Sequence, residues 1–140
     1  MRYFAIELIT TQNRNVVKTI HSYQDFSFVH ALTDVTGFGL SGHIKEMLQN
    51  STLSAIIETI PSIRFSKELS EELGYAFDDC SFLETAGGML SAIDPKKVEE
   101  FSNTLISNNV ENWIVGTIDN IEPGLVRVAD NVENVEIVKY

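Results

Sequence analysis

Apolar side chains recur along the chain with two periods, and these periods predict alternating helices and strands. Helical spacing of three or four residues indicates helices at residues 15–23, 40–49 and 65–73, the last ending at Gly74. A fourth helix is expected from Asp94 to about Ser107, because a capping aspartate followed by proline is typical of a helix start. Its apolar stripe would consist of Val98, Phe101 and Leu105.

Short runs rich in β-branched and aromatic residues predict the strands. They are residues 26–35, 53–60, 89–93, 113–118, 125–128 and 135–138, with 4–9 as a short strand or helix lead-in. Pro61 is expected to end the strand at 53–60, and the C-terminal strands are expected to pair antiparallel. The fold class predicted from this order is α+β, with a mixed, largely antiparallel sheet and packed helices.

The chain of 140 residues has the length of one domain with its own core. It contains no repeat, low-complexity tract or linker that would separate two domains. We therefore predict a single domain over residues 1–140, in which 1–25 form a lead-in segment and 26–140 form the body.

The formal net charge of -10 changes the list of possible partners. Nucleic acids and anionic membranes need Lys and Arg to neutralise their phosphates, so neither is expected as a partner. Cys80 is the only cysteine, which excludes an internal disulfide, and no apolar run approaches the roughly 20 residues of a membrane helix. We expect a soluble, cytoplasmic protein.

The clearest chemistry follows the strand predicted at 26–35. Asp34 comes at its end beside Thr33, and Gly37 and Gly39 permit a tight turn before the next helix. A carboxylate in such a corner suits Mg²⁺, which prefers oxygen ligands, and helix N–H groups suit phosphate. The alternative is that Thr33 and Asp34 only cap a turn.

The glycines also permit a second interpretation. Gly37, Gly39 and Gly42 have the G-x-G-x-x-G spacing of dinucleotide-binding domains, and Glu58 lies downstream where a ribose-binding acid would be. This pattern is weak on its own, because glycine spacing gives frequent false matches. His30 and His43 flank the segment, and we interpret both as structural because neither has a further ligand at metal-binding spacing.

Residues 33–40, with the sequence TDVTGFGL, resemble the signature of selenophosphate synthetases, also called selenide, water dikinases. The similarity continues through Gly42-His43 and Glu46-Met47, and it returns at residues 54–61, 84–90 and 113–118. It covers nearly the whole chain from about Asn13. The chain therefore resembles the C-terminal domain of these enzymes, which are related to aminoimidazole ribonucleotide synthetase.

The resemblance implies a fold like the C-terminal domain of aminoimidazole ribonucleotide synthetase and a family that uses ATP and Mg²⁺ to make selenophosphate from selenide. By position in the signature, Asp34 is the expected metal ligand. The residues expected to face the cofactor are Thr33, Thr36, Gly37, Gly39, Thr85, Gly87 and Gly88. We also expect Asp34 and the Gly87-Gly88 pair to form one concave corner.

The chain departs from the family in ways that leave its function open. The family's reactive cysteine or selenocysteine, glycine-rich loop and lysine belong to an N-terminal domain for which the chain has no room, so no catalytic residue is assigned. Leu83 and Ala86 replace the family's proline and serine, and the stretch 62–83 is shortened. Three interpretations therefore stay open. The chain is accessory to a separately encoded N-terminal catalytic domain, or it is an enzyme in its own right with residual nucleotide binding. In the third interpretation it is a non-catalytic interaction module.

An apolar N-terminal segment bears on assembly. Tyr3, Phe4, Ile6 and Leu8 are more hydrophobic than a frayed terminus requires, so we expect a homodimer or another partner on this surface. The alternative is that the segment folds back as an edge strand of a monomer.

Overall fold

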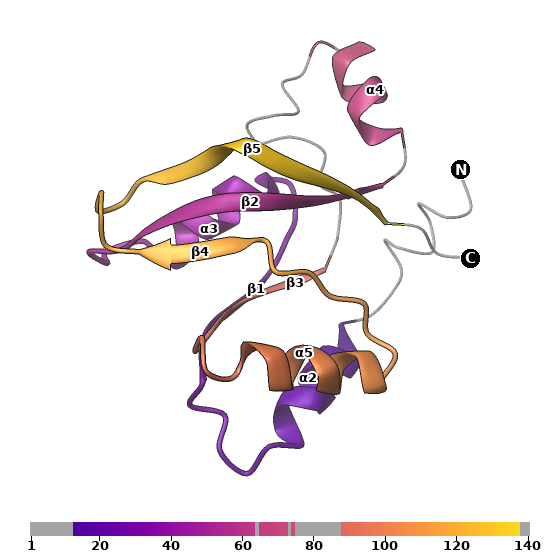
Figure 1. The fold of residues 1–140 in the computed structure, drawn as a ribbon, viewed down its shortest axis with the longest axis vertical. Helices are drawn as coiled ribbons and strands as arrows, with labels where there is room; N and C mark the ends of the chain where they lie inside the picture. The colour runs from indigo at the N-terminus through magenta and orange to yellow at the C-terminus, as the bar shows by residue number, and fades with distance from the viewer. Residues whose placement is uncertain (1–12, 64, 73, 75–87, 138–140) are drawn as a thin grey trace.

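The computed structural model describes residues 13–63, 65–72, 74 and 88–137, and helices and strands alternate along them (Figure 1). The helices are α2 (Arg14–His21), α3 (Gly39–Met47), α4 (Ser66–Glu72) and α5 (Val98–Ser107). The strands are β1 (Val29–Asp34), β2 (Ser54–Ile63), β3 (Met89–Ile93), β4 (Gly116–Asp119) and β5 (Val126–Ile137). The predicted α+β class is confirmed, whereas the segment at 4–9 lies outside the described residues.

The described strands form two sheets. β1 and β3 make an antiparallel ribbon, while β2 lies between β4 and β5 in the order β4-β2-β5. β2 runs antiparallel to β4 and parallel to β5, so this second sheet is mixed. The expected antiparallel pairing of the C-terminal strands is wrong for the described residues, because β4 and β5 each pair with β2 instead.

Two hydrophobic clusters hold these elements together. The first contains Ile44 of α3, Leu48 at the C-cap of that helix and Leu90 of β3, which pack with buried side chains of β2. Its centre is Ile57, which is fully buried and stabilises the fold by about 1.5–3 kcal/mol relative to an exposed side chain. The second cluster consists of Ile20, Phe28, Phe101 and Leu105.

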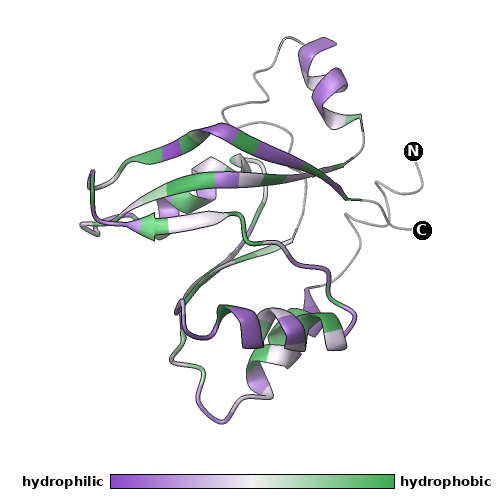
Figure 2. Ribbon diagram, viewed as in Figure 1, coloured by the Kyte–Doolittle hydropathy of each residue, from purple (hydrophilic) through white to green (hydrophobic). Residues whose placement is uncertain are grey.

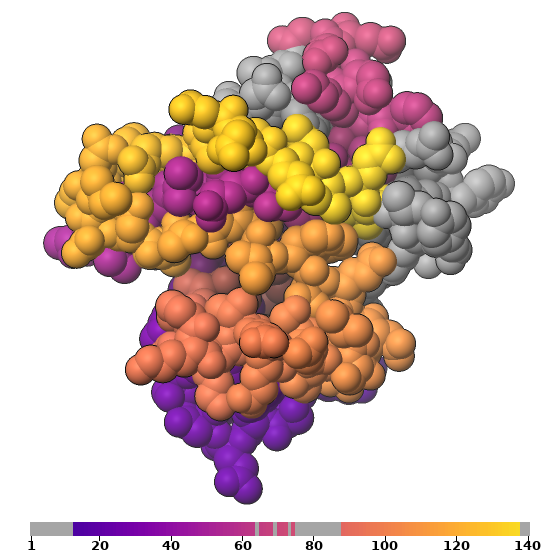
Figure 3. Space-filling model, viewed as in Figure 1, coloured from indigo at the N-terminus to yellow at the C-terminus, as the bar shows by residue number. Residues whose placement is uncertain are grey.

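The ribbon of β1 and β3 connects the two clusters. Its Leu90 belongs to the first cluster, while Val29 and Ile93 at its other end pack against the second. Figure 3 shows the corresponding arrangement, with α5 and the N-terminal helix region in one lobe and the three-stranded sheet in another. The predicted single domain thus has two packed cores.

The lobe of α2 and α5 is built on aromatic contacts. Phe28 meets Phe101 edge to face with ring centroids 5.5 Å apart, and the Tyr23 ring is tilted by 60° to that of Phe28 with centroids 4.8 Å apart. The Tyr23 hydroxyl is 2.9 Å from Thr104 Oγ1, which gives the polar end of this ring a hydrogen bond.

Three predicted boundaries differ from the structure for identifiable reasons. α5 begins at Val98, because Asp94 Oδ1 accepts the Lys96 N–H and caps a separate turn before the helix. Pro61 does not end β2. The ladder with β4 stops at Ile57, and beyond it no described strand pairs with that side of β2, where proline is tolerated. The strands expected at 125–128 and 135–138 are one strand, β5, which continues through an irregularity between its two ladder segments.

A polar network closes the connection from β4 to β5. Ser54 Oγ donates to Asp119 Oδ1 and accepts the Glu122 N–H, and Arg127 Nη2 donates to Asp119 Oδ2 at 3.0 Å. The Ser54 side chain is completely buried, so these bonds satisfy a hydroxyl that cannot reach water.

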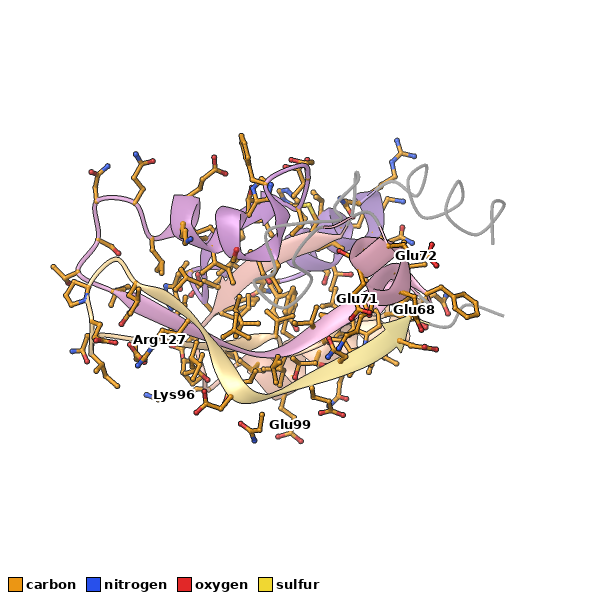
Figure 4. All side chains as sticks on the ribbon, turned by 90° about the horizontal axis from the view of Figure 1, so that it is seen from above. Glu68, Glu71, Glu72, Lys96, Glu99 and Arg127 are labelled. Atoms are coloured by element: carbon orange, nitrogen blue, oxygen red, sulfur yellow. The ribbon has the colours of Figure 1, made fainter. Side chains whose placement is uncertain are left out.

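Charged residues lie on the outer surfaces. α4 is hydrophilic over almost its whole length (Figure 2), and its Glu68, Glu71 and Glu72 project together, away from Lys96 and Glu99 (Figure 4). No helix among the described residues is long and apolar enough to cross a membrane.

Candidate nucleotide-facing site

The candidate site begins where β1 ends. Residues alternate along β1, so that Thr33 is half-buried and Asp34 is exposed. Asp34 pairs with Met89 in the ribbon, and the next residue, Val35, donates its N–H to Gly88 O at 3.0 Å. Gly88 therefore lies beside Asp34, as predicted. Thr85 and Gly87 lie outside the described residues.

A tight turn follows Asp34 and leads directly into α3. The Gly39 N–H donates to Thr36 O at 3.0 Å, and Gly39 has a φ of 68°, a left-handed conformation that favours glycine. Phe38 precedes the helix without a side-chain cap, and Gly37 is exposed. The sequence correctly indicated the need for a glycine at position 39.

Among the described residues, the side chains of Thr33 and Asp34 make no hydrogen bond that caps this turn, and whether these residues serve only as a cap or also hold a ligand stays a prediction. Thr33 Oγ1 donates to the backbone oxygen of Asp34 at 3.3 Å, and no described backbone N–H donates to the Asp34 carboxylate. The turn is instead held by His43 of α3. Its Nε2 accepts the Thr36 N–H at 2.9 Å and lies 3.1 Å from Thr36 Oγ1. The structural interpretation of His43 is confirmed.

His43 also has contacts on its other side. Its Nδ1 lies 3.0 Å from Glu46 Oε2, without the alignment of a hydrogen bond, and the ring packs against Phe38 with centroids 5.9 Å apart. Sequence reasoning missed the bond between His43 and Thr36, because seven residues and a turn separate them. No regular spacing rule relates such positions.

The topology is incompatible with the dinucleotide-binding alternative. That fold needs a strand, a helix and a neighbouring parallel strand in one sheet, whereas β1 and β2 belong to different sheets. Gly42 has a packing role, since a Cβ on it would lie 2.7 Å from Phe38 Cβ. Glu58 Oε2 accepts a hydrogen bond from Thr117 Oγ1 at 3.1 Å, across the sheet.

The Asp34 carboxylate fits the role of one metal ligand. It is exposed, and it forms no ion pair within the part of the chain that the structure describes. The described residues hold no group of three or more His, Cys, Asp or Glu that could bind a metal, and His30 is an exposed residue of β1. Because Mg²⁺ takes about six oxygen ligands, Asp34 suits a site that waters, phosphates and another domain complete.

Two surface hollows lie away from the Asp34 corner. Surface hollows of about 300 and 310 Å³ lie elsewhere, one lined by Ile106 and Val110 and the other by Asp25 and Lys97, among others. Neither hollow is lined by a residue of the Asp34 corner.

Comparisons with known proteins find related sequences and a shared fold. The family model for "AIR synthase related protein, C-terminal domain" matches residues 14–125. A selenide, water dikinase of Methanococcus maripaludis is 35% identical over 135 residues, which cover 94% of this chain and 40% of the relative. One from Methanocaldococcus jannaschii is 41% identical over 105 residues, covering 73% and 29%. The chain thus spans less than half the length of these relatives.

A solved structure shares the fold. The crystal structure of the hydrogenase maturation protein HypE in complex with ATP superposes with a TM-score of 0.70 at 16% identity, covering 89% of this chain and 39% of that one. At this identity the match establishes the fold alone.

Proposed function

On the premise that the chain belongs to the AIR synthase related family as its C-terminal domain, we propose that it contributes the Asp34 corner to a selenide, water dikinase site. That site would transfer phosphoryl groups from Mg·ATP and form selenophosphate from selenide. The observation that carries this proposal is the junction of Asp34, Gly88 and the turn before α3, which offers an exposed carboxylate beside a helix start.

The chain's own residues have separable roles in this proposal. Asp34 binds Mg²⁺ through its carboxylate. A Cβ on Gly37 or Gly88 would meet nothing within 4 Å, so the backbone at these two positions leaves room for phosphate, and Gly39 forms the turn that leads into α3. Thr33, Thr36, Thr85 and Gly87 complete the cofactor-facing set. Bound Mg·ATP supplies the phosphoryl group and neutralises charge that develops on it.

The proposal makes the chain accessory rather than autonomous. A single carboxylate is too few for tight Mg·ATP binding, which typically needs several oxygen ligands from the protein and the phosphates together. Its partner is the N-terminal catalytic half of a selenide, water dikinase. The chain alone is expected to release no phosphate from ATP in the presence of selenide.

A chimera tests this directly. The C-terminal part of the Methanococcus maripaludis relative is replaced by this chain, because a covalent link keeps both halves at high effective concentration. We expect selenide-dependent phosphate release from the chimera and none from the chain alone. Asp34→Asn should abolish that release, whereas Asp130→Asn, which removes an exposed carboxylate from β5, should preserve it.

Two results would contradict the proposal. One is turnover by the isolated chain above the background of its Asp34→Asn variant. The other is a chimera with native circular dichroism that releases no phosphate. The second result would favour the interaction-module alternative, which the replacements at Leu83 and Ala86 support.

A further inference from the structure

We propose that His43 is a positioning residue that fixes how Thr36 is presented at the Asp34 corner. This inference rests on the proposed function in one respect only, namely that the corner faces a cation. His43 is 5% exposed, and its ring packs against Phe38 with centroids 5.9 Å apart. Both hydrogen-bond contacts of its Nε2 are with Thr36, two residues beyond Asp34.

The hydrogen bond from Thr36 determines the tautomer of His43. A backbone N–H can only donate, so Nε2, which accepts the Thr36 N–H at 2.9 Å, carries no proton. The proton of the neutral ring is therefore on Nδ1, which lies 3.0 Å from Glu46 Oε2 without the alignment of a hydrogen bond. A charged imidazolium would place two N–H donors against each other.

The tautomer in turn determines the direction of the Thr36 hydroxyl. Thr36 Oγ1 lies 3.1 Å from the unprotonated Nε2, so in this contact the hydroxyl is the donor and shares the single lone pair of Nε2 with the Thr36 N–H. Both the N–H and the O–H of Thr36 are then directed at one imidazole nitrogen. The backbone N–H is not available to a phosphate, while the two lone pairs of Oγ1 remain available to a cation.

His43 thus makes Thr36 an oxygen ligand rather than a phosphate donor. Oxygen lone pairs suit Mg²⁺ and Mn²⁺, directly or through a bound water. Outer partners that orient a ligand in this way typically change metal affinity about 10–100-fold when they are removed. Thr36 and Asp34 would then bind the same cation from one turn.

The first experiment measures the hydrogen bonds in the isolated chain by nuclear magnetic resonance. Long-range ¹⁵N correlation should show the Nδ1–H tautomer for His43, and the Thr36 amide should be protected from hydrogen exchange. His43→Leu should remove this protection, while His43→Gln should retain it, because its Oε1 can replace Nε2 as the acceptor. His21→Gln, on the exposed end of α2, is the matched control.

The second experiment uses Mn²⁺ as the probe and does not depend on activity. Paramagnetic broadening should appear first at the amide signals of the residues around Asp34 and Thr36. Thr36→Val should raise the Mn²⁺ concentration required for this broadening by about tenfold. Thr36→Val keeps the backbone N–H that donates to His43, so the turn stays anchored in this variant. It therefore tests the role of the hydroxyl even if His43→Leu does not fold. Thr36→Ser should restore Mn²⁺ binding.

The outcomes separate this inference from the proposed function. An Nε2–H tautomer, or an unprotected Thr36 amide in the unmodified chain, would overturn the role of His43. Broadening that Thr36→Val leaves unchanged would overturn the role of the hydroxyl as a ligand. An inactive chimera would contradict the proposed function and leave both of these measurements unaffected.

Discussion

Gly116 marks the closest approach of backbone to backbone between β4 and β2. A Cβ on this residue would lie 2.0 Å from the carbonyl oxygen of Ile56, a distance that no real contact permits. Since Ile57, its partner in the ladder, is fully buried at the centre of the first cluster, the strand cannot move away without opening the core.

Gly116→Ala should therefore lower the free energy of unfolding by about 1–3 kcal/mol, the usual cost of forcing an extra group into a packed site. Urea denaturation measures this change. Gly88→Ala serves as the control, because a Cβ there would meet nothing within 4 Å. Equal urea denaturation midpoints for Gly116→Ala and Gly88→Ala would contradict this prediction, because they would show that β4 moves to accommodate the added methyl group.

Asp119 links stability to pH. The hydrogen bond from Ser54 lowers the pKa of its carboxyl below the ordinary value of 3.8, and the Ile121 N–H and Arg127 act in the same direction. A carboxyl whose pKa is lower in the folded than in the unfolded protein stabilises the fold above the unfolded value. That stabilisation is lost as pH falls through the folded pKa.

Asp119→Asn should consequently reduce the melting temperature near neutral pH, and the difference from the unmodified chain should shrink as pH falls from about 6 to about 3. Thermal melts across this range provide the test. Asp130→Asn reports the effect of the charge change alone. A constant difference between Asp119→Asn and the unmodified chain would rule out the proposed linkage.

Single residues also show which parts of the site were predictable. Asp34 and Gly39 were identified because a carboxylate at a strand end and a glycine in a turn are local features of the sequence. The bond between His43 and Thr36 depends on how α3 folds back over the turn, which local patterns do not encode. The sequence alone allows Gly42 to be the last glycine of a G-x-G-x-x-G dinucleotide-binding pattern. Its packing role becomes visible only in the structure, where a Cβ at this position would clash with Phe38.

At the scale of elements, the end of α5 shows a well-defined cap. The Val110 N–H donates to Leu105 O at 2.9 Å, and Asn109 adopts a φ of 59°. This arrangement is a helix C-terminus of the Schellman type, in which glycine is the preferred residue at the left-handed position.

Asn109→Gly should raise the free energy of unfolding slightly, and Asn109→Ala should lower it by about 1 kcal/mol, because alanine tolerates a left-handed backbone poorly. Differential scanning calorimetry of both variants measures the effects. The matched control is Asn108→Gly, which should destabilise, since Asn108 has a φ of -94° and donates from Nδ2 to Thr19 Oγ1. A stabilising Asn108→Gly would contradict this account of the cap.

The existence of most elements followed from periodicity, but their partners did not. β3 was predicted at its observed bounds because its apolar run is short and clearly delimited. The parallel pairing of β2 with β5 joins segments distant in the chain, and nothing in either segment specifies the other. The prediction that Pro61 ends the strand was wrong for the same reason. Whether β2 can contain a proline at position 61 depends on where its ladder with β4 ends.

At the scale of the whole molecule, several large apolar side chains remain on the surface. Phe38 is 66% exposed, Ile114 63% and Ile121 69%. Exposed apolar area of this kind favours association. We therefore expect light scattering to report a mass above 15.7 kDa that increases with concentration.

The control for this measurement is the chain with Phe38→Ser, Ile114→Ser and Ile121→Ser together, which should associate less. A mass that stays at 15.7 kDa at every concentration would exclude self-association. These side chains would then be available only to a foreign partner, such as the proposed N-terminal half.

The central position of β2 has a consequence for biosynthesis. Both of its neighbours, β4 and β5, come from residues after 115, so residues 64–115 must leave the ribosome before either edge of β2 can be paired. During that interval an apolar strand has two open edges, which are prone to pair with other chains. Translation rate and chaperone access, rather than final stability alone, should therefore govern the yield of folded protein.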